Sequence, residues 1–496
     1  MFKIVDNFTK RPKADLVILP CFQETKRAKP AVHLDDLEPL ISPIIASGDF
    51  SGKEGESMLV HLTTLPKAKE RRLLLLGIGK KNLCHLERLR RSYAAAMKRC
   101  RNKKWPQINV ILPSLKELDV NEVTRAVSEG VGLTLYLFEE WKTIKKPYHI
   151  KQITFVGAKE IKIPQKTLNI LSGVNLARDL VNRNALDITP QTLAAQAQKL
   201  TTHFSSVTTT TLNKKQIEKE KMGLFLAVSN GSHMDPVLIT TQYKGNPKTS
   251  DLIMIVGKGV TFDTGGLNLK PTYSIEDMRT DMGGAAAALG IIQAAASMHL
   301  KHNIVAIIPA TENAISSYSY KPGDTYRACQ GNTVEIINTD AEGRLILADA
   351  LTYGQKKFSP KYIIDIATLT GAIVVALGEE RAGLFSNNDT LSKYAMQAGE
   401  ETGERVWRMP IDPEYKPLLK SNFADIKNAA TPKGQAGSIT AALFLQEFIA
   451  DDTPWMHLDI AGTSFIGTSK HYHSTQATGA GVRIVLRTIE LCSHEL

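Results

Sequence analysis

Short apolar runs of strand length alternate with helical patterns along most of this chain. In the first 150 residues there are apolar runs at 15–22, 73–79 and 108–113, with one helical pattern at 83–101 between the second and third runs and another at 121–140 after the third. This alternation is typical of βαβ units, in which a helix crosses between neighbouring strands of a parallel sheet. It therefore predicts an α/β fold.

The same rhythm returns after residue 190, following a strand pattern at 152–157 and a helical pattern at 165–182. We place a domain boundary at about residue 160. The expected architecture is two α/β domains, a smaller one at 1–160 and a larger one at 161–496 with a mixed, mostly parallel central sheet flanked by helices. Strands are expected at 237–243, 252–256, 303–309, 333–337, 362–366 and 456–460, a further buried strand at 372–377, and helices at 283–297, 343–353 and 438–450.

Composition excludes several classes of protein. At 496 residues, with 43% apolar and 22% charged residues, the chain suits a globular protein with more than one core. Its longest apolar runs are strand-length, so no transmembrane helix is expected, and the N-terminus lacks the pattern of a secretory signal. The odd count of five cysteines, without a CxxC pair, argues against a disulfide framework and predicts reduced thiols in the cytoplasm.

Positive charge is concentrated in the N-terminal part. The net charge is +11, and residues 1–150 contain 27 Lys and Arg against 17 Asp and Glu, which accounts for +10 of it. One basic cluster lies on and after the helical pattern at 83–101: Arg88, Arg90, Arg91, Lys98, Arg99, Arg101, Lys103 and Lys104. Such a cluster is either a nucleic-acid contact or a solvated face, and few aromatic residues interleave with it.

Two segments have compositions that core packing does not explain. The first, 256–271, follows a predicted strand and contains four glycines, which allow sharp turns and close approach to a ligand. Lys258, Asp263 and Lys270 lie on it, and Asp281 follows shortly before a Gly- and Ala-rich helical pattern.

The second segment, 338–345, joins a predicted strand to a predicted helix. Its carboxylates Asp340 and Glu342 are two residues apart, so in an extended segment they share a face. The helix N-terminus beside Arg344 suits an anion. Carboxylates gathered in this way repel one another unless cations lie between them, and oxygen ligands with one amine fit a paired site for Mn²⁺, Mg²⁺ or Zn²⁺.

Each of these residues also has a simpler interpretation when it is taken alone. Asp263 could be a turn residue, Asp340 a helix N-cap, and Glu342 with Arg344 a surface pair. The glycine-rich segment could hold a phosphate, although it lacks the GxxxxGK[ST] order. These interpretations together do not explain so many charged residues after apolar strands, so we favour a metal site.

At these segments the sequence resembles the leucyl (cytosol) aminopeptidase family. Residues 338–345 read NTDAEGRL, the signature octapeptide of that family, and 256–271 match VGKG-x-TFD-x-GG-x-x-x-KP. The DMGGAA stretch at 281–286 and the segments 367–372 and 457–462 extend the resemblance, which covers about 170–490. One departure is the segment 182–186, which reads NRNAL where members often read NxPxN.

The resemblance implies a metal-dependent aminopeptidase that removes leucine-like N-terminal residues from peptides. Two divalent ions, Mn²⁺ or Zn²⁺, would be held by Lys258, Asp263, Asp281, Asp340 and Glu342, with Lys258 as a neutral amine. Lys270 would polarise the scissile carbonyl, and Arg344 would hold a bicarbonate. Met278, Thr368, Gly371 and Ala461 would line the side-chain pocket.

The resemblance also implies a cytoplasmic homohexamer without a membrane partner, whose N-terminal domain is regulatory or supports the oligomer. Two other classes compete with it. A two-metal phosphoesterase would more often use histidine ligands, and none lies in these motifs. A nucleic-acid-binding or scaffolding protein would not need the full ligand set, although binding of nucleic acid by the basic N-terminal domain stays open as a secondary role.

Overall fold

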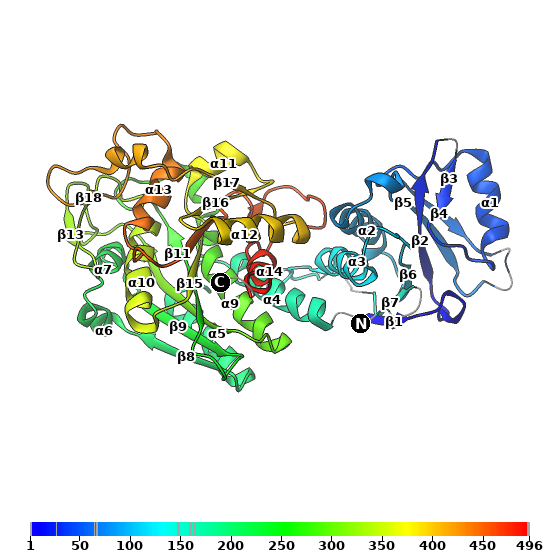
Figure 1. The fold of residues 1–496 in the computed structure, drawn as a ribbon, viewed down its shortest axis with the longest axis horizontal. Helices are drawn as coiled ribbons and strands as arrows, with labels where there is room; N and C mark the ends of the chain where they lie inside the picture. Colours follow the sequence, from blue (N-terminus) through cyan, green and yellow to red (C-terminus); the bar gives the residue numbers. More distant parts are fainter. Residues whose placement is uncertain are drawn as a thin grey trace. The chain divides into compact units, whose positions relative to one another are not determined.

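The computed structural model describes residues 2–493 apart from 26, 64, 66–67, 146–148, 158–160 and 162–164. It divides into two compact units (Figure 1). Unit 1 comprises Met1–Leu171 and Thr468–Ser474, and unit 2 comprises Ser172–Gly467 and Thr475–Leu496. The division lies inside helix α4 (Gln165–Asn182), whereas the boundary expected at residue 160 falls among segments outside the described residues.

A seven-stranded mixed sheet forms the centre of unit 1. Its strand order is β1-β7-β6-β2-β5-β4, with β3 paired to β2, and every pair is parallel except β4 with β5 and β3 with β2. The strands are β1 (Phe2–Val5), β2 (Leu16–Gln23), β3 (Ala28–Pro30), β4 (Ser57–His61), β5 (Arg72–Gly77), β6 (Gln107–Ile111) and β7 (Gln152–Val156). The helices packed with them are α1 (Glu38–Ser47), α2 (Leu86–Arg101) and α3 (Val120–Leu135).

Strand β2 shows why this sheet is covered on both faces. Its side chains alternate between two cores: Leu16 and Ile18 pack with α2 and α3, and Val17 and Leu19 pack with α1. A strand that is buried on both faces reads as a continuous apolar run, as β2 does. The expected α/β fold of this unit is confirmed, with antiparallel strands added at β3 and β4.

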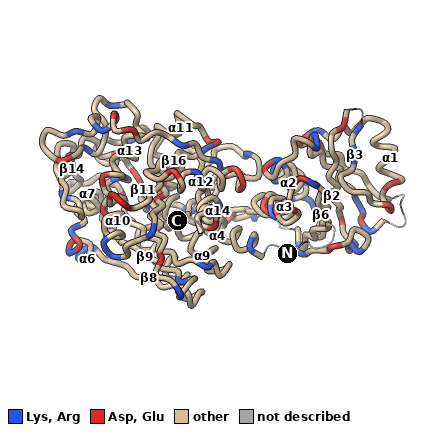
Figure 2. Tube along the Cα trace, viewed as in Figure 1, with Lys and Arg blue, Asp and Glu red and all other residues tan. Residues whose placement is uncertain are grey.

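The basic cluster of α2 makes many contacts inside unit 1. Arg90 has no exposed surface and lies 2.7 Å from Glu129 as well as against Glu87. The other contacts are Arg91 with Glu87, Arg88 with Glu54, Arg99 with the Ser57 carbonyl, Arg101 with the Thr134 carbonyl, and Lys98 with Ser469. Acidic and basic residues are interspersed over α2 and α3 (Figure 2). This helix is therefore tied into its own domain through its charges.

A nine-stranded mixed sheet forms the centre of unit 2, in the order β17-β16-β19-β15-β10-β12-β9-β8, with β11 paired to β12. The inner pairs β10–β12, β10–β15 and β15–β19 are parallel, while β8, β9 and β16 pair antiparallel with their inner neighbours. This confirms a mixed, mostly parallel sheet. The strands are β8 (Val207–Leu212), β9 (Val237–Lys244), β10 (Leu252–Gly257), β11 (Gly259–Asp263), β12 (Asn303–Asn313), β15 (Tyr362–Ala367), β16 (Ala382–Ser386), β17 (Val406–Arg408) and β19 (Trp455–Asp459).

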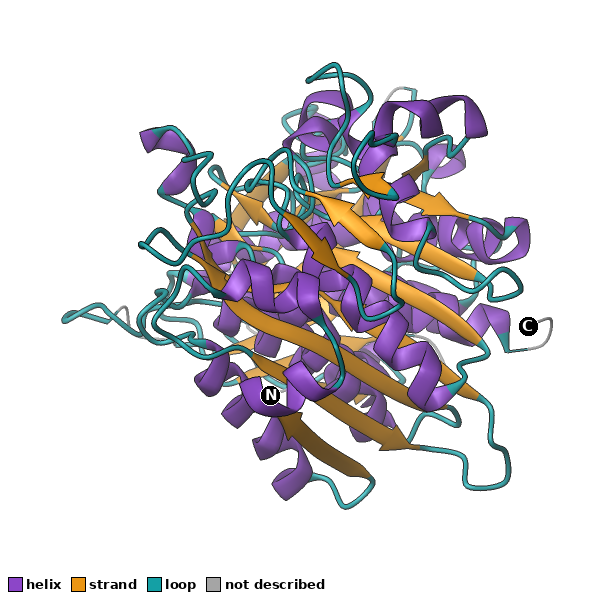
Figure 3. Cartoon of the chain, turned by 90° about the vertical axis from the view of Figure 1, so that its left-hand side faces the viewer, coloured by secondary structure: helices purple, strands orange, loops and turns teal. Residues whose placement is uncertain are grey.

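Helices cover this sheet (Figure 3). Helix α9 packs against β10, β12 and β15, while α10 shares a core with Met254 and Val256 of β10. The helices of unit 2 are α5 (Pro190–His203), α6 (Lys214–Lys219), α7 (Gly223–Ser229), α8 (Thr272–Ile275), α9 (Gly283–Met298), α10 (Gly343–Phe358), α11 (Gly371–Leu377), α12 (Asp389–Thr402), α13 (Gly437–Gln446) and α14 (Val482–Cys492). No helix in the described ranges has the length and apolarity needed to cross a bilayer.

Two expected strands differ in the structure. The run 372–377 was expected as a buried strand, and this is wrong: it lies in helix α11, which Thr370 caps and whose Val375 is 90% exposed. The run 333–337 contributes β14 (Thr333–Glu335), which belongs to a separate three-stranded sheet with β13 (Thr325–Arg327) and β18 (Ile426–Lys427). The five cysteines are free thiols.

Candidate metal centre and substrate pocket

The predicted site residues come from the ends of neighbouring elements of unit 2. Lys258 directly follows β10, Asp263 ends β11, and Asp281 lies just before α9. Asp340 and Glu342 immediately precede α10. Lys258 and Asp263 thus lie at the edge where parallel strands place their carboxyl ends, which is where open α/β sheets bind their ligands, and the other three residues reach this edge from the starts of helices.

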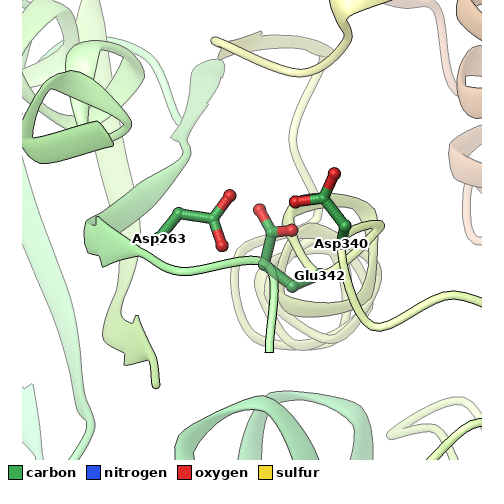
Figure 4. Close-up of side chains that lie close together, drawn as sticks. All are labelled: Asp263, Asp340 and Glu342. Atoms are coloured by element: carbon green, nitrogen blue, oxygen red, sulfur yellow. The ribbon is translucent and has the colours of Figure 1, made fainter. Parts of the chain in front are cut away.

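Three carboxylates lie close together at this edge. Ligand atoms of Asp263, Asp340 and Glu342 all lie within 4.8 Å of one another. Their side chains point toward a common centre, Asp263 from the β11 side and the other two from the start of α10 (Figure 4). Asp263 and Glu342 are almost fully buried, at 1% and 2% exposed. Buried carboxylates this close together require positive charge among them.

Two lysines provide that charge in this structure. Lys258 Nζ lies 2.7 Å from Asp281 Oδ2 and 2.8 Å from Glu342 Oε1. Lys270 Nζ lies 2.8 Å from Asp263 Oδ2 and 2.5 Å from Asp340 Oδ1. The structure thus brings together the four acidic residues, named here the acidic cluster (Asp263, Asp281, Asp340 and Glu342), with both lysines singled out by the sequence.

The donor atoms of this cluster fit divalent cations. Asp281 Oδ2 and Asp340 Oδ1 are buried, and among the described residues neither accepts a hydrogen bond of ordinary geometry, although each has a lysine ammonium nearby. Buried polar atoms normally have such a partner, so these oxygens are available to ligate. Carboxylate oxygens with one amine nitrogen are a suitable set for Mn²⁺ or Zn²⁺.

Ionisation at the cluster follows from burial and mutual repulsion. Burial, with added repulsion from Glu342, raises the pKa of Asp263 to about 6, and burial raises the pKa of Asp281 well above its ordinary value. Burial disfavours the charged form of Lys258, but attraction to Asp281 and Glu342 outweighs it and raises the lysine pKa. A neutral Lys258 would therefore need a dication beside it to displace the proton.

Buried polar residues that the sequence analysis missed hold the acidic cluster in place. Asn313, at the end of β12, donates its amide to Asp263 Oδ1 at 2.8 Å and to the Thr339 carbonyl at 3.0 Å. Asn268 accepts from the Thr339 N–H at 2.7 Å. These contacts tie the loop before α10 to the glycine-rich segment, so that the two loops bearing carboxylates are fixed together.

Arg344 is held by another missed residue, Asn428. The guanidinium is 7% exposed and donates to the Asn428 carbonyl at 2.9 Å, while the Asn428 side chain binds the backbone of Ile337 and Asn338. Burial lowers the pKa of Arg344 to about 10, so the side chain stays cationic at neutral pH. Unlike the other predicted site residues, Arg344 does not line the cavity of about 500 Å³ that opens beside the acidic cluster.

A cavity of about 500 Å³ opens beside the acidic cluster. Its wall includes all four residues predicted for a side-chain pocket, Met278, Thr368, Gly371 and Ala461. Thr368 also contacts the cluster directly, because its hydroxyl donates to Asp281 Oδ1 at 2.7 Å and its carbonyl accepts from Lys258 Nζ at 2.9 Å. A concave site whose wall carries both charged residues and small or apolar ones suits a ligand of mixed character.

Two glycines permit the close approach of backbone and side chain at this site. A Cβ on Gly343 would lie 2.6 Å from Lys258 Cε, and a Cβ on Gly284 would lie 2.0 Å from the Ile366 carbonyl oxygen. Gly284 therefore excludes any side chain, because it would meet backbone, and a side chain at position 343 would displace Lys258. The departure at 182–186 is joined to the pocket wall, because Arg279, next to Met278, donates to the Asn182 carbonyl at 3.4 Å.

Comparison with known proteins places both units in one family. The catalytic-domain model of the cytosol aminopeptidase family matches residues 175–486, and its N-terminal-domain model matches 18–145. The chain is 44% identical to a probable cytosol aminopeptidase of Protochlamydia amoebophila over 99% of both chains, and 43% identical to one of Chlamydia trachomatis serovar A over 98% of this chain and 97% of the relative.

Solved structures agree with this placement. A mutant of tomato leucine aminopeptidase is 32% identical with a TM-score of 0.87, and the match covers 98% of this chain and 96% of the tomato chain. The bottromycin maturation enzyme BotP in complex with Mn is 28% identical with a TM-score of 0.84, over 97% of this chain and 100% of that one. The resemblance found in the sequence is thus confirmed: the chain belongs to the cytosol (leucyl) aminopeptidase family of metal-dependent exopeptidases.

Proposed function

We propose that this enzyme removes leucine-like residues from the free N-termini of peptides, using two divalent ions, Mn²⁺ or Zn²⁺. Lys258 and the acidic cluster would hold the ions, with Asp263 and Glu342 shared between them. The proposal rests on the convergence of these five residues in the wall of the 500 Å³ cavity. The solved complex of BotP with Mn supports the choice of metal.

The bound ions would supply Lewis acidity toward a water molecule and toward the substrate's carbonyl oxygen. Lys270 lies at the cavity with an ammonium that is 15% exposed, so it can hydrogen-bond the oxygen on which negative charge develops. The free N-terminal amine of the substrate would bind among these charged groups, and an internal peptide has no such amine. This requirement accounts for exopeptidase specificity.

Arg344 would hold a bicarbonate that accepts and returns the proton during hydrolysis. The proposal is supported by a buried guanidinium that stays cationic at neutral pH, at the N-terminal end of α10 where a helix favours anions. Asn428 would keep that guanidinium oriented.

The preference for leucine-like residues rests on the small and apolar residues of the cavity wall. Met278 offers a flexible apolar surface there, and Gly371 and Ala461 leave room for a branched side chain. Ser464 and Phe465 line the same cavity and would adjust the preference.

We further infer a cytoplasmic homohexamer in which unit 1 is regulatory or supports assembly. The names of the relatives, cytosol aminopeptidases, support the location. The intradomain contacts of Arg90 and its neighbours on α2 do not favour nucleic-acid binding by this unit. Light scattering on the purified protein would test the assembly, and a mass of one subunit would refute it.

The activity is tested with Leu-p-nitroanilide and its N-acetylated form in the presence of Mn²⁺. Release of nitroaniline from the free-amine substrate alone is expected, and EDTA should abolish it. The Asp340→Ala variant should be inactive. As a control, Asp389→Ala should be as active as wild type, because Asp389 lies on α12 in an exposed ion pair with Arg408. Cleavage of the acetylated substrate, or of neither substrate, would refute the proposal.

A further inference from the structure

The carboxylate of Asp459 connects two separate walls of the pocket. It lies at the end of β19, directly beside the end of β15, where Ala367 is its partner in the sheet. Its Oδ1 accepts from the N–H of Leu369 at 3.0 Å and of Ala461 at 3.2 Å. Its Oδ2 accepts from the Thr370 hydroxyl at 2.7 Å. One side chain therefore binds both segments that carry three of the four predicted pocket residues, Thr368, Gly371 and Ala461.

These contacts fix the conformation of each wall. Thr370, held by Asp459, caps helix α11 by accepting from the Ile373 N–H at 3.1 Å, so Asp459 sets the start of the helix on which Gly371 lies. The other wall packs tightly against the same helix, because a Cβ on Gly462 would lie 2.2 Å from the Gly378 carbonyl oxygen. A shift at Asp459 would move both walls together.

Asp459 is suited to this task because a carboxylate only accepts hydrogen bonds. Every group facing its two oxygens in these contacts is a donor, and an amide side chain would set its own N–H groups against them. Asp459 has no exposed surface and does not line the cavity. Its neighbours on β19 also bind one buried carboxylate: His457 lies 2.5 Å from Asp365, and Trp455 donates to the same carboxylate at 2.6 Å.

We propose that Asp459 is a positioning residue that sets the selectivity of the pocket for the substrate's N-terminal side chain, by holding the segments 369–371 and 461–462 at a fixed separation. The inference rests on the proposed aminopeptidase function. It predicts that loss of the carboxylate changes which N-terminal residues are accepted, while the metal-binding residues keep their places.

The test compares Leu- and Ala-p-nitroanilide with the full-length Asp459→Asn variant at saturating Mn²⁺. The ratio of kcat/KM for Leu to that for Ala should fall roughly tenfold, mainly through a higher KM for Leu. Bound Mn²⁺ per subunit should equal that of wild type. The matched control is Asp349→Asn, another carboxylate without exposed surface, which accepts from the Phe225 and Cys329 N–H groups away from the cavity and should leave the ratio unchanged.

A second pair of variants covers the case in which Asp459→Asn does not fold. Thr370→Val removes the hydroxyl that binds Asp459 and should lower the ratio, whereas Thr370→Ser keeps the hydroxyl and should restore it. A ratio within twofold of wild type in both Asp459→Asn and Thr370→Val would overturn the inference, as would an equal fall in Asp349→Asn. Failure of the wild-type enzyme to cleave either substrate would instead refute the proposed function, and this inference with it.

Discussion

Replacing Asn313 by alanine should weaken Mn²⁺ binding without removing any proposed ligand. The Asn313 amide has no exposed surface and donates to Asp263 Oδ1 and to the Thr339 carbonyl. A hydrogen bond to a charged group contributes about 1.5–3 kcal/mol and a neutral one about 1 kcal/mol. Asp263 Oδ1 keeps its bond from the Gly265 N–H at 2.8 Å, so the carboxylate would be loosened rather than released.

The expected loss of metal affinity is roughly 10- to 100-fold, the usual cost of removing a group that orients a metal ligand. The free energy of unfolding of the metal-free protein should fall by about 2.5–4 kcal/mol, the sum of the two hydrogen bonds. Calorimetric titration of metal-free protein with Mn²⁺ measures the first quantity, and urea denaturation measures the second.

The matched control lies at the other end of the same strand. Asn303 begins β12 and donates its amide to the Asn246 and Thr249 carbonyls at 2.9 and 3.0 Å, away from the acidic cluster. Asn303→Ala should lower stability while leaving Mn²⁺ affinity unchanged. If Asn313→Ala binds Mn²⁺ as tightly as Asn303→Ala does, the proposed orienting role of Asn313 is wrong.

Three further outcomes are expected. Lys270→Met should lower kcat for Leu-p-nitroanilide about 10²- to 10³-fold with little change in KM, and an unchanged kcat would exclude its role at the oxyanion. Burial raises the pKa of Asp349 to about 7, so its contribution to stability is complete below about pH 4 and is lost as the pH rises through 7. The unfolding free energy of wild type, relative to that of Asp349→Asn, should therefore fall by about 3 kcal/mol from pH 5 to pH 8 in urea denaturation, and a pH-independent difference would contradict this. Arg90→Met should reduce the free energy of unfolding by about 3–5 kcal/mol, since it leaves Glu87 and Glu129 buried without their cation. A loss under about 1 kcal/mol would show that the two glutamates do not need the Arg90 charge for stability.

The elements that carry the site could be predicted because their signals are local. Strand β10 is a short apolar run ending in glycine, and Asp340 and Glu342 sit at a strand-to-helix change of pattern. Each can be read within a window of about ten residues. That Lys258 and Asp263 lie close together follows from a general property of parallel sheets, whose strand ends meet at one edge, whereas Asp340 and Glu342 follow β14 of a separate sheet, so their approach does not follow from it.

The helix at 371–377 could not be predicted from apolar content alone. Its β-branched residues favour a strand, and its length equals that of a strand. The Thr370 cap decides the outcome, and Thr370 is oriented by Asp459, a residue about ninety positions away. Tertiary context thus overrides local propensity here.

The supporting residues Asn313, Asn428 and Asp459 were missed for a similar reason. Each is a single polar residue at or just after a strand, without a repeating pattern around it, and each acts on a loop distant in sequence. Their importance arises from burial and from the donors that face them. Both become visible only when the fold is known.

The segment Thr468–Ser474 belongs to unit 1, and it affects when this unit can finish folding during synthesis. Ribosomes make the first 171 residues long before these seven, so unit 1 leaves the ribosome without a piece of its own structure. Lys98, for example, finds its hydrogen-bond acceptor Ser469 only when nearly the whole chain has been translated. Completion of the N-terminal unit therefore waits for the C-terminal part of the chain, although this unit is the first to be made.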